Sequence, residues 1–177
     1  MQPADTAKHE QTSSADGSDE SYGRALQVAF RFMNFRSRSV DEVRKRIGRE
    51  YSEPVTQRVL EALAGYGYLD DAAFAVAWRD ARNRRGPRGV ALLRRELRQK
   101  GLQADVIDAA LEQVDEDVNA YRAGARRAER WLQADGITAG EFRTKMWGFL
   151  QRRGFSSGVC RDTVERLRMD FAGGPDD

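Results

Sequence analysis

Histidine and cysteine are nearly absent from this chain of 177 residues, which contains one of each, His9 and Cys160. Metal sites need clustered His, Cys or carboxylate ligands, and a nucleophilic Ser or Cys needs a nearby general base. His9 lies in a polar N-terminal stretch, and we expect Cys160 to be a buried small hydrophobic residue. One cysteine also excludes an internal disulfide. We therefore expect a protein that is not an enzyme and has no metal and no cofactor.

Long apolar runs and glycine-rich phosphate loops are also missing. The longest apolar run, from Ala72 to Trp78, has seven residues, whereas a membrane-spanning helix needs about twenty. Residues 1–21 contain no apolar block of the kind found in secretory signals. The "AGGPDD" at the C-terminus is not followed by the Lys and helix of a Walker motif. These absences predict a cytoplasmic protein without a membrane partner.

Both ends of the chain are poor in apolar residues. We expect residues 1–21 to be a disordered acidic tail with a charge of −4, and residues 171–177 to be a flexible C-terminus. The chain as a whole has a formal charge of +2 and residues 171–177 carry −2, so residues 22–170 carry +8. A basic body is typical of proteins that meet nucleic acid or a nucleoprotein.

The apolar spacing between the ends is helical, with no strand alternation, and predicts an all-α fold. "SVDE" (Ser39 to Glu42) and "TAGE" (Thr138 to Glu141) are capping boxes. Asp70 is placed to cap the helix that follows it. Gly86 and Pro87 are expected to stop one helix and begin the next.

Shifting the sequence by 53 residues reveals an internal repeat. Trp78 then falls on Trp131, and "KGL" at 100–102 falls on "RGF" at 153–155. The repeat predicts three tandem three-helix units, residues 22–68, 69–116 and 117–170, stacked as an elongated solenoid that could be curved. We expect such a chain to be a monomer, with both tryptophans in the core.

Charged residues are concentrated in the second and third repeats. From Arg79 to Lys100 there are nine basic and two acidic residues, while residues 104–117 hold six acids and no base. We interpret the acids as a solvated third helix rather than a cation site. Arg94 and Arg98, like Arg122, Arg126 and Arg130, place like charges four residues apart, which is unfavourable unless an external anion relieves the repulsion. Arginine also suits bidentate binding of phosphate or carboxylate.

The stretch "YLDDAAFAVAWRDARNRRGPRGVALLRRELRQKGL", residues 68–102, resembles the core of the RecX family of regulatory proteins. The family signature falls on these positions: Tyr68, Leu69, Asp70, Asp71, Phe74, Ala75, Arg82, Gly86, Glu96, Leu97, Lys100 and Gly101. The resemblance implies an all-α modular protein that binds the RecA filament on single-stranded DNA. It also implies inhibition of RecA ATP hydrolysis, strand exchange and the co-protease activity behind the SOS response, and hence a role in DNA repair and homologous recombination.

We predict that exposed arginines make the contact with the RecA filament or with DNA. They are Arg82, Arg84, Arg85, Arg88, Arg94, Arg95 and Arg98, with Arg122, Arg126 and Arg130 as a second patch. Two alternatives remain open at this point. One is a general DNA-binding protein, for single or double strands, with helix-turn-helix-like modules. The other is a helical scaffold that docks an acidic protein.

Overall fold

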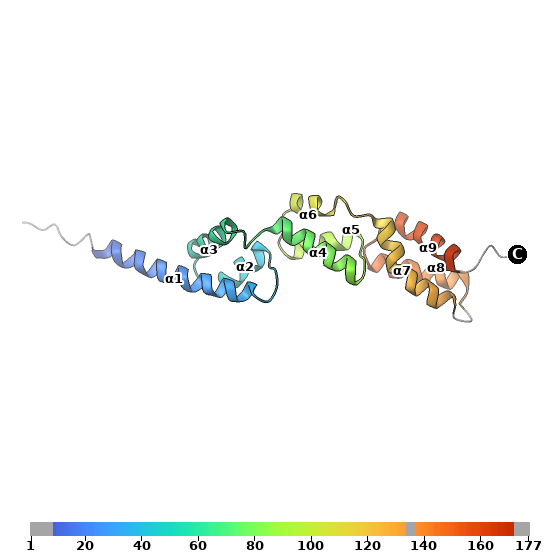
Figure 1. Ribbon diagram of the computed structural model, residues 1–177, viewed down its shortest axis with the longest axis horizontal. Helices are drawn as coiled ribbons and strands as arrows, with labels where there is room; N and C mark the ends of the chain where they lie inside the picture. Colours follow the sequence, from blue (N-terminus) through green and yellow to red (C-terminus); the bar gives the residue numbers. More distant parts are fainter. Residues whose placement is uncertain (1–8, 134–136, 172–177) are drawn as a thin grey trace, which may run out of the picture. The chain divides into compact units, whose positions relative to one another are not determined.

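The computed structural model describes residues 9–133 and 137–171, and within them the only regular secondary structure is α-helix (Figure 1). The helices are α1 (His9–Met33), α2 (Val40–Ile47), α3 (Glu53–Gly65), α4 (Asp71–Arg85), α5 (Val90–Gln99), α6 (Ala104–Leu111), α7 (Glu116–Leu132), α8 (Ala139–Arg152) and α9 (Ser157–Phe171). The predicted all-α helical-repeat fold is confirmed. None of these helices, taken over the described residues, is long and apolar enough to cross a bilayer.

Helix α1 begins at His9, which differs from the disordered tail predicted for residues 1–21. Acidic residues near its middle find basic partners: Asp19 pairs with Arg58 at 2.6 Å and Glu20 with Arg24 at 2.5 Å. The Arg58 guanidinium also lies 4.2 Å from the centre of the Tyr22 ring. Composition alone does not reveal such pairs. Residues 1–8 and 172–177 of the predicted tails lie outside the described residues.

The helices pack into two compact units. Unit 1 comprises the chain up to Phe74 together with Lys100–Leu102, and unit 2 comprises Ala75–Gln99 and the chain from Gln103 onward. In unit 1, α1, α2 and α3 pack on one another around Val43, Ile47, Val59 and Leu63, which are fully buried. The units divide the second set of three helices, so the unit of packing differs from the unit of sequence repetition.

Unit 2 has its largest core among α7, α8 and α9. Met146 and Leu150 are fully buried there, as are Leu93 and Leu97 at the matching positions of α5. Cys160 is also fully buried in the α7–α9 core, as expected for a small hydrophobic residue. The alignment at a shift of 53 residues therefore identified equivalent core positions.

Most of the predicted helix caps are present. Ser39 and Glu42 form a capping box on α2, and Thr138 and Glu141 form one on α8. Asp70 accepts a 2.9 Å hydrogen bond from the Ala73 backbone N–H at the start of α4. The prediction that Gly86 and Pro87 begin the next helix is wrong, because α5 begins at Val90.

A hydrogen-bonded junction in unit 1 joins the first repeat to the second. The Ser39 hydroxyl donates to the Lys100 carbonyl at 2.6 Å, and the Val40 N–H donates to the Asp71 carboxylate at 3.0 Å. Gly101 has a φ of +80° and lies directly against the Asp41 side chain. The N-terminus of α2 is thus capped by a carboxylate from the following repeat, which also favours the helix dipole.

A matching junction in unit 2 joins the second repeat to the third. The Gly89 N–H donates to the Arg153 carbonyl at 2.9 Å, and the Val90 N–H donates to Glu116 Oε1 at 2.7 Å. Gly154, with a φ of +84°, lies against the backbone and Cβ of Leu92. In the first two repeats, the second helix is therefore capped by the acid at the first residue of the next three-helix set, Asp71 of α4 or Glu116 of α7, beside a glycine turn.

Glu42 links the capping box of α2 to two basic side chains in unit 1. Arg36 donates to it at 2.7 Å and Lys100 at 2.8 Å. Burial on its own raises the pKa of the Glu42 carboxyl, but the hydrogen bonds and charges of Arg36 and Lys100 outweigh burial and lower that pKa to about 2. Glu42 is thus ionised whenever the protein is near neutral pH.

We expect Gly154→Ala to destabilise the protein by about 2–4 kcal/mol, because the added Cβ meets Leu92 and because alanine is disfavoured at positive φ. The midpoint of thermal unfolding should fall by roughly 5–15 °C. Gly140→Ala is the matched control, since nothing lies within 4 Å of its Cβ position in α8. Equal melting temperatures for the two variants would contradict the tight junction.

The depressed pKa of Glu42 makes a prediction about acid stability. Its contribution is complete above the unfolded-state pKa of about 4.5 and is lost as the pH falls through about 2. Glu42→Gln keeps a side chain suited to a capping box but has no charge. The difference in unfolding free energy between wild type and Glu42→Gln, measured with urea, should be large at pH 7 and shrink by pH 3. A difference that does not change with pH would show that the ion pairs contribute nothing.

Candidate functional site: an arginine-lined cleft

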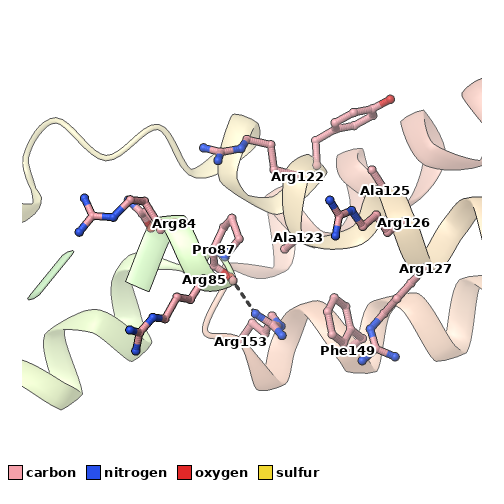
Figure 2. Close-up of a pocket in the computed structure, with 13 residues that line it drawn as sticks. Arg84, Arg85, Pro87, Arg122, Ala123, Ala125, Arg126, Arg127, Phe149 and Arg153 are labelled. Atoms are coloured by element: carbon pink, nitrogen blue, oxygen red, sulfur yellow. Dashed lines mark hydrogen bonds between the residues drawn. The ribbon is translucent and has the colours of Figure 1, made fainter. Parts of the chain in front are cut away.

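Unit 2 contains a cleft with a volume of about 530 Å³ between the end of α4, the α4–α5 loop, α7 and the end of α8 (Figure 2). Its lining residues are Asn83, Arg84, Arg85, Gly86, Pro87, Tyr121, Arg122, Ala123, Ala125, Arg126, Arg127, Phe149 and Arg153. Six of them are arginines, and none of these described lining residues is acidic. We call this site the arginine cleft.

Four predicted contact residues meet in the arginine cleft. Arg84 and Arg85 extend from the end of α4, and Arg122 and Arg126 extend from α7 (Figure 2). All four are exposed, and no acid in the described part of the chain pairs with them. Two arginine patches that the sequence places in different repeats therefore line one site.

Two further arginines of the cleft, Arg127 and Arg153, were not predicted. Their guanidinium carbons lie 4.5 and 4.8 Å from the centre of the Phe149 ring, and Arg153 donates to the Pro87 carbonyl at 3.3 Å (Figure 2). Burial and the nearby charge of Arg127 lower the pKa of Arg153. A signal for Arg153 existed, because the repeat alignment places it on Lys100, directly before the turn glycine.

Arg82 and Arg88 are satisfied within the protein, which corrects the expectation that they await an external anion. Arg82 Nε lies 3.0 Å from Glu96 Oε2, and Arg88 pairs with the other oxygen of the same carboxylate. The Trp78 indole N–H also donates to Glu96 at 2.9 Å. Glu96 therefore ties α4, the α4–α5 loop and α5 together, and these two arginines are structural.

Arg94 is also paired internally, with Asp108 of α6. The acidic residues of 105–117 are consequently more than a solvated face. Asp108 neutralises Arg94, Asp115 caps α7 by accepting from the Val118 N–H at 2.9 Å, and Glu116 caps α5. The expectation that Arg94 needs an external anion is therefore wrong, because Asp108 neutralises it within the protein.

The remaining predicted arginines lie elsewhere in unit 2. Arg95 and Arg98 line a second cavity of about 790 Å³, together with Arg94, Phe155 and Glu116. Both are exposed and have no acidic partner within the described residues. Arg130 is exposed on α7 and lines neither cavity.

Trp78 and Trp131, two of the three tryptophans, are partly buried rather than enclosed in the core. The Arg82 guanidinium lies 4.3 Å from the Trp78 ring centre, and that of Arg127 lies 5.8 Å from Trp131. Trp131 packs against the α7–α9 core. Their rings are thus in contact with the protein's own arginines, at the edge of the core.

Removing the Glu96 carboxylate should leave three buried or half-buried donors without their acceptor. We expect Glu96→Ala to lower the free energy of unfolding by about 1–3 kcal/mol, measured with urea. Glu129→Ala is the control, because the Glu129 side chain on α7 is exposed and forms no ion pair within the described residues. If both variants unfold at the same urea concentration, Glu96 does not hold α4 and α5 together.

Comparisons with known proteins point to one family. A family model described as "RecX, second three-helix domain" matches residues 70–111. "Regulatory protein RecX" of Chlorobium limicola is 32% identical over 159 residues, covering 89% of this chain and 96% of that protein. The protein of the same name from Mycolicibacterium smegmatis is 30% identical, covering 92% and 88%. The crystal structure of RecX from Lactobacillus salivarius aligns with a TM-score of 0.75 at 15% identity, over 85% of this chain and 99% of that one.

Proposed function

Because the chain belongs to the RecX family, we propose that it is a negative regulator of the RecA recombinase. It binds the RecA filament on single-stranded DNA and lowers ATP hydrolysis, strand exchange and co-protease activity. The observation that carries this proposal beyond family membership is the arginine cleft, which has six cations and no acid in its described lining.

The charge of the cleft suits a polyanionic partner. Four exposed arginines line the cleft, and two of them, Arg122 and Arg126, place like charges four residues apart on α7, a repulsion that a partner with closely spaced anions relieves. Arginine forks bind phosphate and carboxylate through two parallel hydrogen bonds. A nucleoprotein filament presents both groups, so it satisfies the cleft better than an ordinary protein surface does.

Regulation in this proposal requires no catalysis by the chain itself. Cys160 is fully buried, and burial, together with Glu116, raises the pKa of its thiol, so it stays protonated and unreactive. The protein would act by occupancy, as a cytoplasmic monomer. Arg84, Arg85, Arg122 and Arg126 are our first choice for the contact, and Arg95, Arg98 and Arg130 remain further predicted contacts.

The direct test is RecA ATP hydrolysis on single-stranded DNA. We expect substoichiometric wild-type protein to depress the rate, and we expect Arg122→Glu combined with Arg126→Glu to weaken inhibition by roughly tenfold or more in concentration. Lys145→Glu with Arg152→Glu is the control: it makes the same change in net charge on exposed α8 residues that line neither cavity. Circular dichroism of each variant should show that helicity is kept.

Two outcomes would count against the proposal. An unchanged ATPase rate at excess wild-type protein would reject RecA regulation. Tight binding to naked DNA without any preference for RecA-coated strands would favour a general DNA-binding protein instead. A third double variant, Arg95→Glu with Arg98→Glu, separates the arginine cleft from the second cavity, because it changes the latter alone.

A further inference from the structure

The aromatic rings that line the arginine cleft already contact arginine side chains of the protein. Phe149 is 8% exposed, and Arg127 and Arg153 lie over its ring. Arg166 lies 4.3 Å from the ring centre of Tyr121, whose hydroxyl donates to Asp170 at 2.7 Å. These are the only aromatic residues of the described lining. The cleft therefore offers no free ring on which a nucleobase could stack.

The polar character of the cleft is almost entirely cationic. Arg122 and Arg126 are one helical turn apart on α7 and face the end of α4, which carries Arg84 and Arg85 (Figure 2). Arg127 and Arg153 also line the cleft, and their positive charges add to those of the four exposed arginines. A ligand with a permanent negative charge on each successive unit matches this arrangement best.

The volume of the cleft limits the shape of that ligand. About 530 Å³ lies within the range of roughly 300–1,000 Å³ that is usual for sites of small molecules. A flexible single strand can place a short stretch of its backbone in such a space, whereas a duplex cannot enter it. Carboxylates of a peptide reach a comparable charge density only in an uninterrupted acidic run.

We infer that the arginine cleft binds the phosphodiester backbone of a single nucleic-acid strand over two or three consecutive phosphates, with the bases turned outward. This inference rests on the proposed function, from which it takes the RecA filament as the partner. Within that filament it assigns the cleft to the DNA strand rather than to RecA. Recognition is then independent of base identity and even of the presence of bases. Affinity comes from phosphate contacts and depends steeply on salt.

Fluorescence anisotropy with the full-length chain tests this. The experiment uses three labelled probes: an oligo-dT strand, an abasic strand with the same phosphates, and oligo-glutamate. Each has about twelve units, a length within the usual range of single-strand binding sites. We expect the two phosphate strands to bind within about twofold of each other and the oligo-glutamate to bind at least roughly tenfold more weakly. Arg122→Gln with Arg126→Gln should lose about tenfold or more in affinity for both strands, and its salt slope should fall by about 1.4.

Lys145→Gln with Arg152→Gln, outside the cleft, should bind like wild type. Abasic DNA that binds tenfold more weakly than oligo-dT would overturn the inference, because the bases would then be read. Oligo-glutamate that binds as well as DNA would assign the cleft to an acidic protein segment. An unaffected Arg122/Arg126 double variant would place the strand elsewhere. The ATPase assay separates the two proposals: wild-type protein that inhibits RecA but binds neither phosphate strand overturns this inference alone.

Discussion

The structure depends on one repeated contact, in which the acid at the first residue of α4 or α7 accepts a hydrogen bond from the N-terminus of the second helix of the preceding three-helix set. Asp71 serves α2 in this way and Glu116 serves α5. Both carboxylates satisfy an orphan backbone N–H and lie at the positive end of a helix dipole. A glycine turn beside each contact, at Gly101 and Gly154, lets the backbones approach closely. Apolar side chains then pack between the helices that these contacts hold together.

The fold could be predicted from the sequence because its helices are specified by residues close together in the chain. Helical spacing and capping boxes predicted the all-α fold and the caps of α2 and α8. Comparing these local patterns at a shift of 53 residues then identified the equivalent core positions on α5 and α8. The start of α5 was missed because its cap is supplied by Glu116, which lies 26 residues further along the chain.

The site was less predictable, since its charges are settled by tertiary contacts. Arg82 and Arg88 look free in the sequence, but the α4–α5 turn brings both to Glu96. Conversely, Arg84 and Arg126 are far apart in the sequence and line the same cleft. Local arginine counts therefore predict an anionic partner, while the fold decides which of the described arginines have no acid of the protein beside them.

The boundaries of the sequence repeats differ from those of the packing units, and this affects the design of truncated fragments. A fragment that ends at residue 68 would lack Asp71 and the 100–102 segment, both of which belong to unit 1. A fragment that ends at residue 116 would keep Glu116 but would lose Gly154 and expose the α5 surface at Leu92 against which Gly154 lies. Truncations designed on the visible sequence period would thus remove parts of their neighbours, and loss of activity in such pieces would report unfolding rather than a missing binding surface.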